Sequence, residues 1–206
     1  MKTLTTTLLA LAATQLVATA ATTTISGANV RGFNDENGTA LGAGILGVLV
    51  VNTATGEAGD TGFTGVINVS PGALNLGSTL DPSGNLLILN LIDSENNALE
   101  GLDEINGAGS GNVIDLDTSA AATGDEYAVF WFSSLSLGGG NTTAAAGDAF
   151  GVARESDWLV GAGGSNPTIS PVTNAGNANL TVTPEPASAA LLGLGALGFA
   201  MRRRRA

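Results

Sequence analysis

The 206-residue chain has 18 acidic and 7 basic residues and contains neither cysteine nor histidine. These absences exclude disulfide bonds, thiolate chemistry and imidazole bases or ligands. Residues 21–183 hold 17 acidic but only 2 basic side chains, a formal charge of −15. Such a surface repels polyanions, so we expect no nucleic-acid partner.

The first 20 residues have the three-part layout of a secretory signal peptide. Lys2 supplies a short basic region, residues 8–17 are mainly apolar, and Ala18 and Ala20 place small side chains at positions −3 and −1 of a cleavage site. We expect export through the Sec translocon and cleavage by signal peptidase after Ala20, with Ala21 as the neighbouring alternative. The other interpretation is a buried N-terminal helix.

Residues 21–160 alternate short apolar runs with clusters of Gly, Asn, Asp and Ser, which is typical of strands and turns. The pattern predicts an acidic all-β domain, a sandwich or barrel of short strands. The predicted strands are Ile45–Val51, Phe63–Val69, Leu86–Ile92, Val113–Leu116, Tyr127–Leu135, Ala149–Ala153, Trp158–Val160 and Leu180–Val182. The last of these lies within 161–183, a segment rich in Gly, Ser, Asn and Pro that predicts an extended linker.

An acidic cluster follows the third predicted strand. Asp93, Glu95, Asn97 and Glu104 have the spacing of positions 1, 3, 5 and 12 of a calcium-binding EF-hand loop. Ala98 stands where that loop needs glycine, and no helix is predicted on either side. We therefore favour a solvated acidic loop and expect no metal or other cofactor, with a calcium site as the alternative.

Two other features carry weaker functional hypotheses. Asp115 and Asp117, followed by the Asp125–Glu126 pair, could serve as acid and base in glycoside hydrolysis, but carboxylates at strand edges are usually solvated. Trp131 and Trp158 could stack on sugar rings, although Trp131 lies within a continuous apolar run that favours the core. We therefore expect no enzymatic activity.

The segment 184–206 has three parts. Pro184, Glu185 and Pro186 come first, an uncharged apolar run at 187–201 follows, and Arg202, Arg203, Arg204 and Arg205 come next. As a helix the run would rise about 22 Å, short of the hydrocarbon core of about 30 Å. We expect a short transmembrane helix that holds the chain in the inner membrane, with the arginines in the cytoplasm.

This tripartite segment resembles the PEP-CTERM sorting domain of Gram-negative bacteria. The resemblance implies cleavage near the Pro-Glu-Pro motif by an exosortase-type membrane enzyme, and a role in organisms that make extracellular polysaccharide. The stretch 124–160, with its two Gly-Asp strand starts, also resembles a segment of other uncharacterised PEP-CTERM proteins and implies no activity. The other interpretation of 184–206 is an ordinary membrane anchor.

Together these features predict an exported, non-enzymatic protein of the cell surface or extracellular matrix that is associated with extracellular polysaccharide. The protein is expected to reach this location through an intermediate anchored in the inner membrane. A secreted carbohydrate- or calcium-binding module is the alternative, and a secreted carboxylate-dependent hydrolase comes third.

Overall fold

The computed structural model describes residues 22–26, 29–54, 63, 67–94, 98–100, 113–117, 121–161 and 170–184. Within these ranges the chain forms strands and turns and no helix, which confirms the predicted all-β class. The strands are β1 (Thr22–Ser26), β2 (Asn29–Arg31), β3 (Phe33–Asn34), β4 (Leu46–Asn52), β5 (Gly72–Ala73), β6 (Leu86–Asp93), β7 (Ala98–Glu100), β8 (Val113–Asp117), β9 (Glu126–Phe132), β10 (Thr143–Ala144), β11 (Ala149–Ala153), β12 (Gly176–Asn177) and β13 (Leu180–Thr181).

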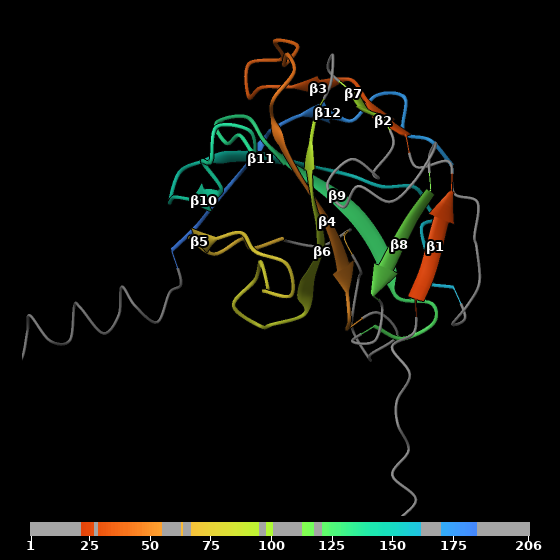
Figure 1. The fold of residues 1–206 in the computed structure, drawn as a ribbon. Helices are drawn as coiled ribbons and strands as arrows, with labels where there is room; N and C mark the ends of the chain where they lie inside the picture. The colour runs from red at the N-terminus through yellow and green to blue at the C-terminus, as the bar shows by residue number, and fades with distance from the viewer. Residues whose placement is uncertain are drawn as a thin grey trace, which may run out of the picture.

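A five-stranded antiparallel sheet with strand order β13-β11-β9-β4-β6 forms the centre of the domain. β4 and β9 pair in unbroken register from Leu46–Phe132 to Asn52–Glu126. Four two-stranded pairs surround it: β1 with β8, β2 with β7, β3 with β12, and β5 with β10. Figure 1 shows β5 and β10 on one side of the central sheet and β1 and β8 on the other.

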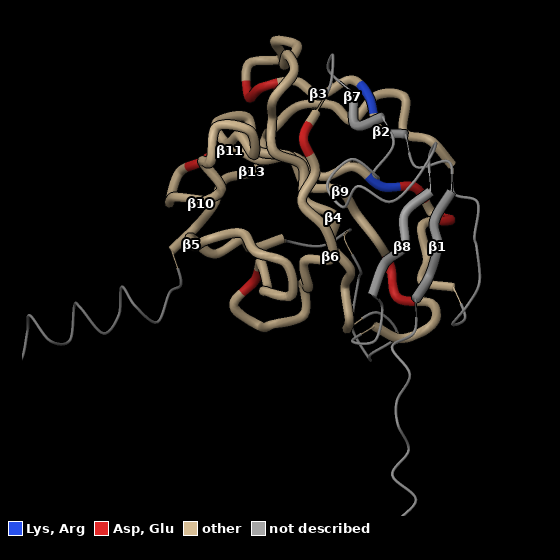
Figure 2. The backbone as a smooth tube through the Cα atoms, viewed as in Figure 1, with Lys and Arg blue, Asp and Glu red and all other residues tan. Residues whose placement is uncertain are grey.

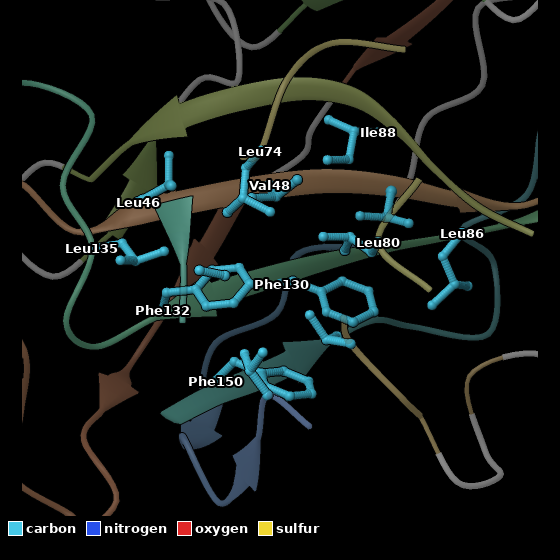
Figure 3. Packing of buried hydrophobic residues seen from close by; sticks show 14 of the residues in the cluster. Leu46, Val48, Leu74, Leu80, Leu86, Ile88, Phe130, Phe132, Leu135 and Phe150 are labelled. Atoms are coloured by element: carbon cyan, nitrogen blue, oxygen red, sulfur yellow. The ribbon is translucent and has the colours of Figure 1, made fainter. Parts of the chain in front are cut away.

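Both faces of the central sheet are buried, which explains why its inner strands are continuous apolar runs. Successive side chains of a strand point to opposite faces. In β9, Tyr127, Val129 and Trp131 join one core cluster, whereas Phe130 and Phe132 join the other. Figure 3 shows the second cluster, in which the rings of Phe130 and Phe132 pack near that of Phe150. The sheet is therefore the middle layer of the domain.

A β-bulge in β6 keeps its apolar side chains on the correct faces. Leu49 pairs with Asn90 and the next residue, Val50, pairs with Ile88, so Leu89 is an extra residue without a partner in β4. An inserted residue inverts the inward–outward alternation beyond it. Accordingly, Ile88 packs in the second cluster before the bulge, and the odd-numbered Leu91 does so after it.

Two Gly-Asp turns repeat the same local structure at 122–125 and 145–148. In each turn the glycine has positive φ, +96° and +94°, and the aspartate Oδ2 accepts a 2.7 Å hydrogen bond from the N–H of the alanine three residues earlier. The glycine N–H then donates to the carbonyl of Val160 in the first turn and of Val182 in the second. The N–H of each valine donates back to the aspartate carbonyl. The turns are thus an internal structural repeat.

Three of the strand predictions need correction. Residues 67–69 of the predicted strand Phe63–Val69 are not in a strand, although Val69 is fully buried. Trp158–Val160 contributes only an isolated bridge between Glu126 and Leu159, because Gly161 and the polar turn before it limit the pairing. β9 ends at Phe132, where Ser133 and Ser134 begin a turn.

The linker prediction is wrong for the described residues 170–183. This segment forms β12 and β13 and buries Val172, Ala178 and Val182 in the core clusters or beside them. Its small polar residues bridge loops: Ser170 donates two hydrogen bonds to Asp157. The composition of this segment therefore predicted a flexible linker where the chain is closely packed against the domain.

Candidate functional site

The fold extends directly into the predicted sorting motif. The N–H of Val182 donates to the Asp148 carbonyl and the N–H of Gly147 to the Val182 carbonyl, both at 2.9 Å. One residue later, the N–H of Thr183 donates to the Val69 carbonyl at 3.0 Å. The Val182 side chain is only 2% exposed. The backbone is therefore fixed to the domain as far as Thr183.

Pro184 follows Thr183 directly, so the first residue of the predicted processing motif lies at the edge of the folded domain. Glu185, Pro186 and the four arginines Arg202, Arg203, Arg204 and Arg205 lie outside the described residues, as do Ala18 and Ala20 of the predicted signal peptidase site. In the part of the chain that the structure describes, no helix is long and apolar enough to cross a membrane.

Sequence reasoning missed Val182 and Thr183 as the junction between fold and motif. The alternation of Leu180, Thr181, Val182 and Thr183 predicted a short strand but not its location, because the surrounding Asn and Gly residues indicated a linker. What places the strand is the second Gly-Asp turn, 145–148, with which Val182 exchanges two backbone hydrogen bonds. The first such turn binds Val160 in the same way. The repetition of the Gly-Asp pair in the sequence was therefore the available signal that a second strand segment pairs with the turn at 145–148.

Of the predicted calcium ligands, only Asp93 lies in the described part of the chain. It ends β6, and its Oδ1 atom is buried with no hydrogen-bond partner among the described residues. Glu95, Asn97 and Glu104 lie outside those residues. Within the described ranges no three acidic, histidine or cysteine side chains gather closely enough to hold a metal ion. The four-residue calcium site stays a prediction.

The acidic residues at 125 and 126 have structural partners. Asp125 is 2% exposed and its carboxylate accepts a hydrogen bond from the N–H of Ala122. Glu126 forms an ion pair with Arg154 at 3.3 Å. Asp115 and Asp117 lie on β8, in register with residues of β1. The contacts of Asp125 fix a turn, and its burial does not suit a residue that must reach a sugar in solution.

Trp131 and Trp158 are core residues, each 1% exposed. The indole N–H of Trp131 donates to the Asn34 carbonyl at 3.4 Å, and that of Trp158 donates to the Ser170 carbonyl at 2.7 Å. A ring that stacks on sugar must present a face to solvent. The sugar-stacking hypothesis is therefore wrong for both tryptophans.

Tyr127 has a buried hydroxyl that makes no hydrogen bond within the described residues. The side chain is 1% exposed, and its ring belongs to the core cluster of Val129 and Trp131. Burial raises the pKa of Tyr127 above its usual value of 10.0, and the neighbouring Asp125 carboxylate raises this pKa further. The hydroxyl is thus held neutral in the folded protein.

Replacing Tyr127 by Phe is expected to stabilise the protein at neutral pH by about 1 kcal/mol, because it removes an unsatisfied buried hydroxyl. A raised pKa in the folded state contributes stability that is present below the unfolded value of about 10 and is lost as the pH rises above it. The stability of the wild type should therefore fall above pH 10. The part of this fall that comes from ionisation of Tyr127 should be absent in Tyr127→Phe.

Urea denaturation of both proteins between pH 7 and pH 11 measures this difference. Because Tyr127 is the chain's one tyrosine, tyrosinate absorbance reports its ionisation directly. A wild type whose tyrosine ionises near pH 10 without unfolding would contradict the burial of the Tyr127 hydroxyl.

Comparison with known proteins adds one finding. Residues 182–205 match the family described as the PEP-CTERM protein-sorting motif. Searches of curated proteins and of solved structures find no match. The matched segment begins at Val182, inside the folded domain, and continues through Pro184, Glu185 and Pro186 to Arg205. The chain therefore carries a PEP-CTERM sorting motif, the signal by which exported proteins are directed to an exosortase-type enzyme.

Proposed function

We propose that this protein is a non-enzymatic component of the cell surface or extracellular matrix, exported, processed at its sorting motif and associated with extracellular polysaccharide. The observation that supports the proposal is the sorting motif at 182–205, which starts on the last residues of an acidic β domain. The high negative charge of that domain favours hydration and keeps it in solution after release.

In the proposed sequence of events, the signal peptide at 1–20 directs export and is removed. The apolar run at 187–201 then holds the chain in the inner membrane, with Arg202–Arg205 on the cytoplasmic side. A run of this length spans less than the usual hydrocarbon core, which suits a transient anchor. The exosortase-type enzyme cuts near 184–186, and the folded domain moves on to the surface or matrix.

Intact mass spectrometry of the protein from its native host tests this proposal. The membrane fraction and the culture medium are measured separately. We expect a species outside the membrane that begins at Ala21 and ends near Pro184–Pro186. A protein found only in the membrane, with all four arginines retained, would show that 184–206 is a permanent anchor and that the sorting proposal is wrong.

Replacing Pro184, Glu185 and Pro186 together by alanine should block processing and leave the chain in the membrane, because the segment that the enzyme recognises is gone. Pro171→Ala is the matched control, since Pro171 is an exposed proline of the same domain outside the motif. The control should be processed like the wild type. Equal release of the triple variant and the control would contradict a role for Pro-Glu-Pro.

A further inference from the structure

The connection between the folded domain and the predicted membrane segment is very short. Thr183 is hydrogen-bonded to Val69, and the apolar run begins at Ala187. Four residue steps of fully extended chain reach about 14 Å. A compact domain of this size is on the order of 40 Å across. The part of the domain beside Thr183 therefore stays within about 14 Å of the membrane segment while the apolar run is inserted.

The face beside this connection is formed by β5, β10 and the loops that flank them. β5 and β10 pair through Thr143–Ala73 and Ala144–Gly72, and the N–H of Leu74 donates to the Thr142 carbonyl at 2.9 Å. The bond from Thr183 to Val69 lies at the start of the same loop. Figure 1 shows the blue C-terminal end of the described chain leaving the domain beside β5. We call the segments 70–76 and 142–147 the exit face.

The exit face carries no charge, although residues 21–183 have a formal charge of −15. The longer segments 67–80 and 133–147, which contain it, hold no Asp, Glu, Lys or Arg. Figure 2 shows the tubes of β5 and β10 in tan, with acidic residues only at their borders. The carboxylates at its borders accept hydrogen bonds from the backbone. Asp81 accepts one from the N–H of Leu86 and Asp148 accepts one from the N–H of Ala145, both at 2.7 Å.

Most side chains on the exit face are small or apolar; Leu74 and Ala144 are buried beneath it, and several others reach solvent. Pro71, Ala73 and Thr143 are exposed. Leu76 is 54% exposed, more than any other large hydrophobic residue that the structure describes. A surface of this kind can approach lipid headgroups without the repulsion that carboxylates would meet within a Debye length of about 8 Å.

We infer that the exit face docks on the headgroup layer of the membrane that holds the apolar run, so that the domain is oriented on the lipid surface before it is cut. This inference rests on the proposed function, because the anchored intermediate exists only if the sorting segment inserts. Docking would present the Pro-Glu-Pro segment at the membrane surface, where a membrane enzyme can reach it, and would turn the acidic remainder of the domain away from anionic lipid.

The repeated turns provide a matched pair of probe positions. Ala146 and Thr123 occupy the same place in the two Gly-Asp turns, and both are exposed. Ala146 lies within the exit face, and its turn leads into β11 beside Phe132, at the end of β9. The turn with Thr123 leads into the start of β9, and the seven residues of β9 span about 20 Å. Because the chain has no cysteine, Ala146→Cys and Thr123→Cys each create a single labelling site.

The test places each labelled chain of residues 21–206, without the signal peptide, in vesicles of phosphatidylethanolamine and phosphatidylglycerol that contain an acceptor dye on the headgroups. Energy transfer from position 146 should be several-fold higher than from position 123. A flexible Gly-Ser insertion of about 20 residues between Thr183 and Pro184 lets the domain drift by roughly 25 Å and should abolish the difference. Leu76→Glu, which adds a charge to the exit face, should reduce the difference in energy transfer between positions 146 and 123.

Two outcomes would overturn the inference, and they differ. Chains that float with the vesicles but transfer energy equally from 123 and 146 are anchored without docking through the exit face. This result would leave the proposed function intact and contradict docking through the exit face. Chains that do not float with the vesicles lack an inserted segment, and the proposed function then fails together with the inference.

Discussion

Gly151→Ala is expected to destabilise the domain by about 3 kcal/mol, a large fraction of the stability of a typical domain. Gly151 pairs directly with Trp131 in the central sheet. A Cβ atom at position 151 would lie under 3.0 Å from three atoms of the Trp131 ring. Both residues are buried between packed layers, so the indole cannot move aside without disturbing Phe33, whose ring centroid is 5.2 Å away.

The effect is measured by urea denaturation, with Gly42→Ala as the matched control. A Cβ atom at position 42 meets nothing within 4 Å, and its backbone does not require positive φ. We therefore expect the control to be neutral or to stabilise by up to about 1 kcal/mol, because alanine reduces the entropy of the unfolded chain. Equal unfolding midpoints for the two variants would show that Trp131 does not lie over Gly151.

A double-mutant cycle identifies the cause. Trp131→Ala alone should cost about 4 kcal/mol, because it leaves a cavity in the core. Once the ring is absent, Gly151→Ala should cost little, so the two changes should be far from additive. Additive effects would mean that the alanine acts on the strand backbone and not on the indole.

Residue patterns predicted the central sheet well because its strands are long and apolar on both faces. The segments that became β4, β6, β9 and β11 were all expected as strands, within a few residues of their bounds. Of the strands in the two-stranded pairs, β8 was expected, as Val113–Leu116, and the others were not. Strands of two or three residues such as β5 and β10 contain too few side chains to show a period. They exist through backbone hydrogen bonds to partners distant in the chain.

The sorting motif was predicted for a different reason: its order of Pro-Glu-Pro, apolar run and arginines is local in sequence and independent of the fold. The role of Val182 was not predictable in this way, since its burial depends on the Gly-Asp turn that lies 34 or more residues earlier along the chain. Local composition identifies the sorting segment, but it cannot show where a folded domain ends.

Removal of the last strand is expected to have the other large effect. A chain of residues 21–184 should fold fully, whereas a chain of residues 21–179 should lose about 3 to 5 kcal/mol. The shorter chain loses the buried side chain of Val182, and full burial of a valine contributes about 1.5 to 3 kcal/mol. It also leaves Gly147, Asp148 and Val69 without their backbone partners at the sheet edge.

Urea denaturation followed by tryptophan fluorescence compares the two chains, since both tryptophans are buried in the folded state. Val182→Ala in the longer chain isolates the side-chain contribution and should cost about 2 kcal/mol. Equal midpoints for the two chains would contradict the packing of β13. If the loss is found, it also constrains processing. A cut before Val182 would remove the buried valine and the backbone hydrogen bonds that Val182 and Thr183 make to Gly147, Asp148 and Val69, so the released protein keeps its stability only when the enzyme cuts after Thr183.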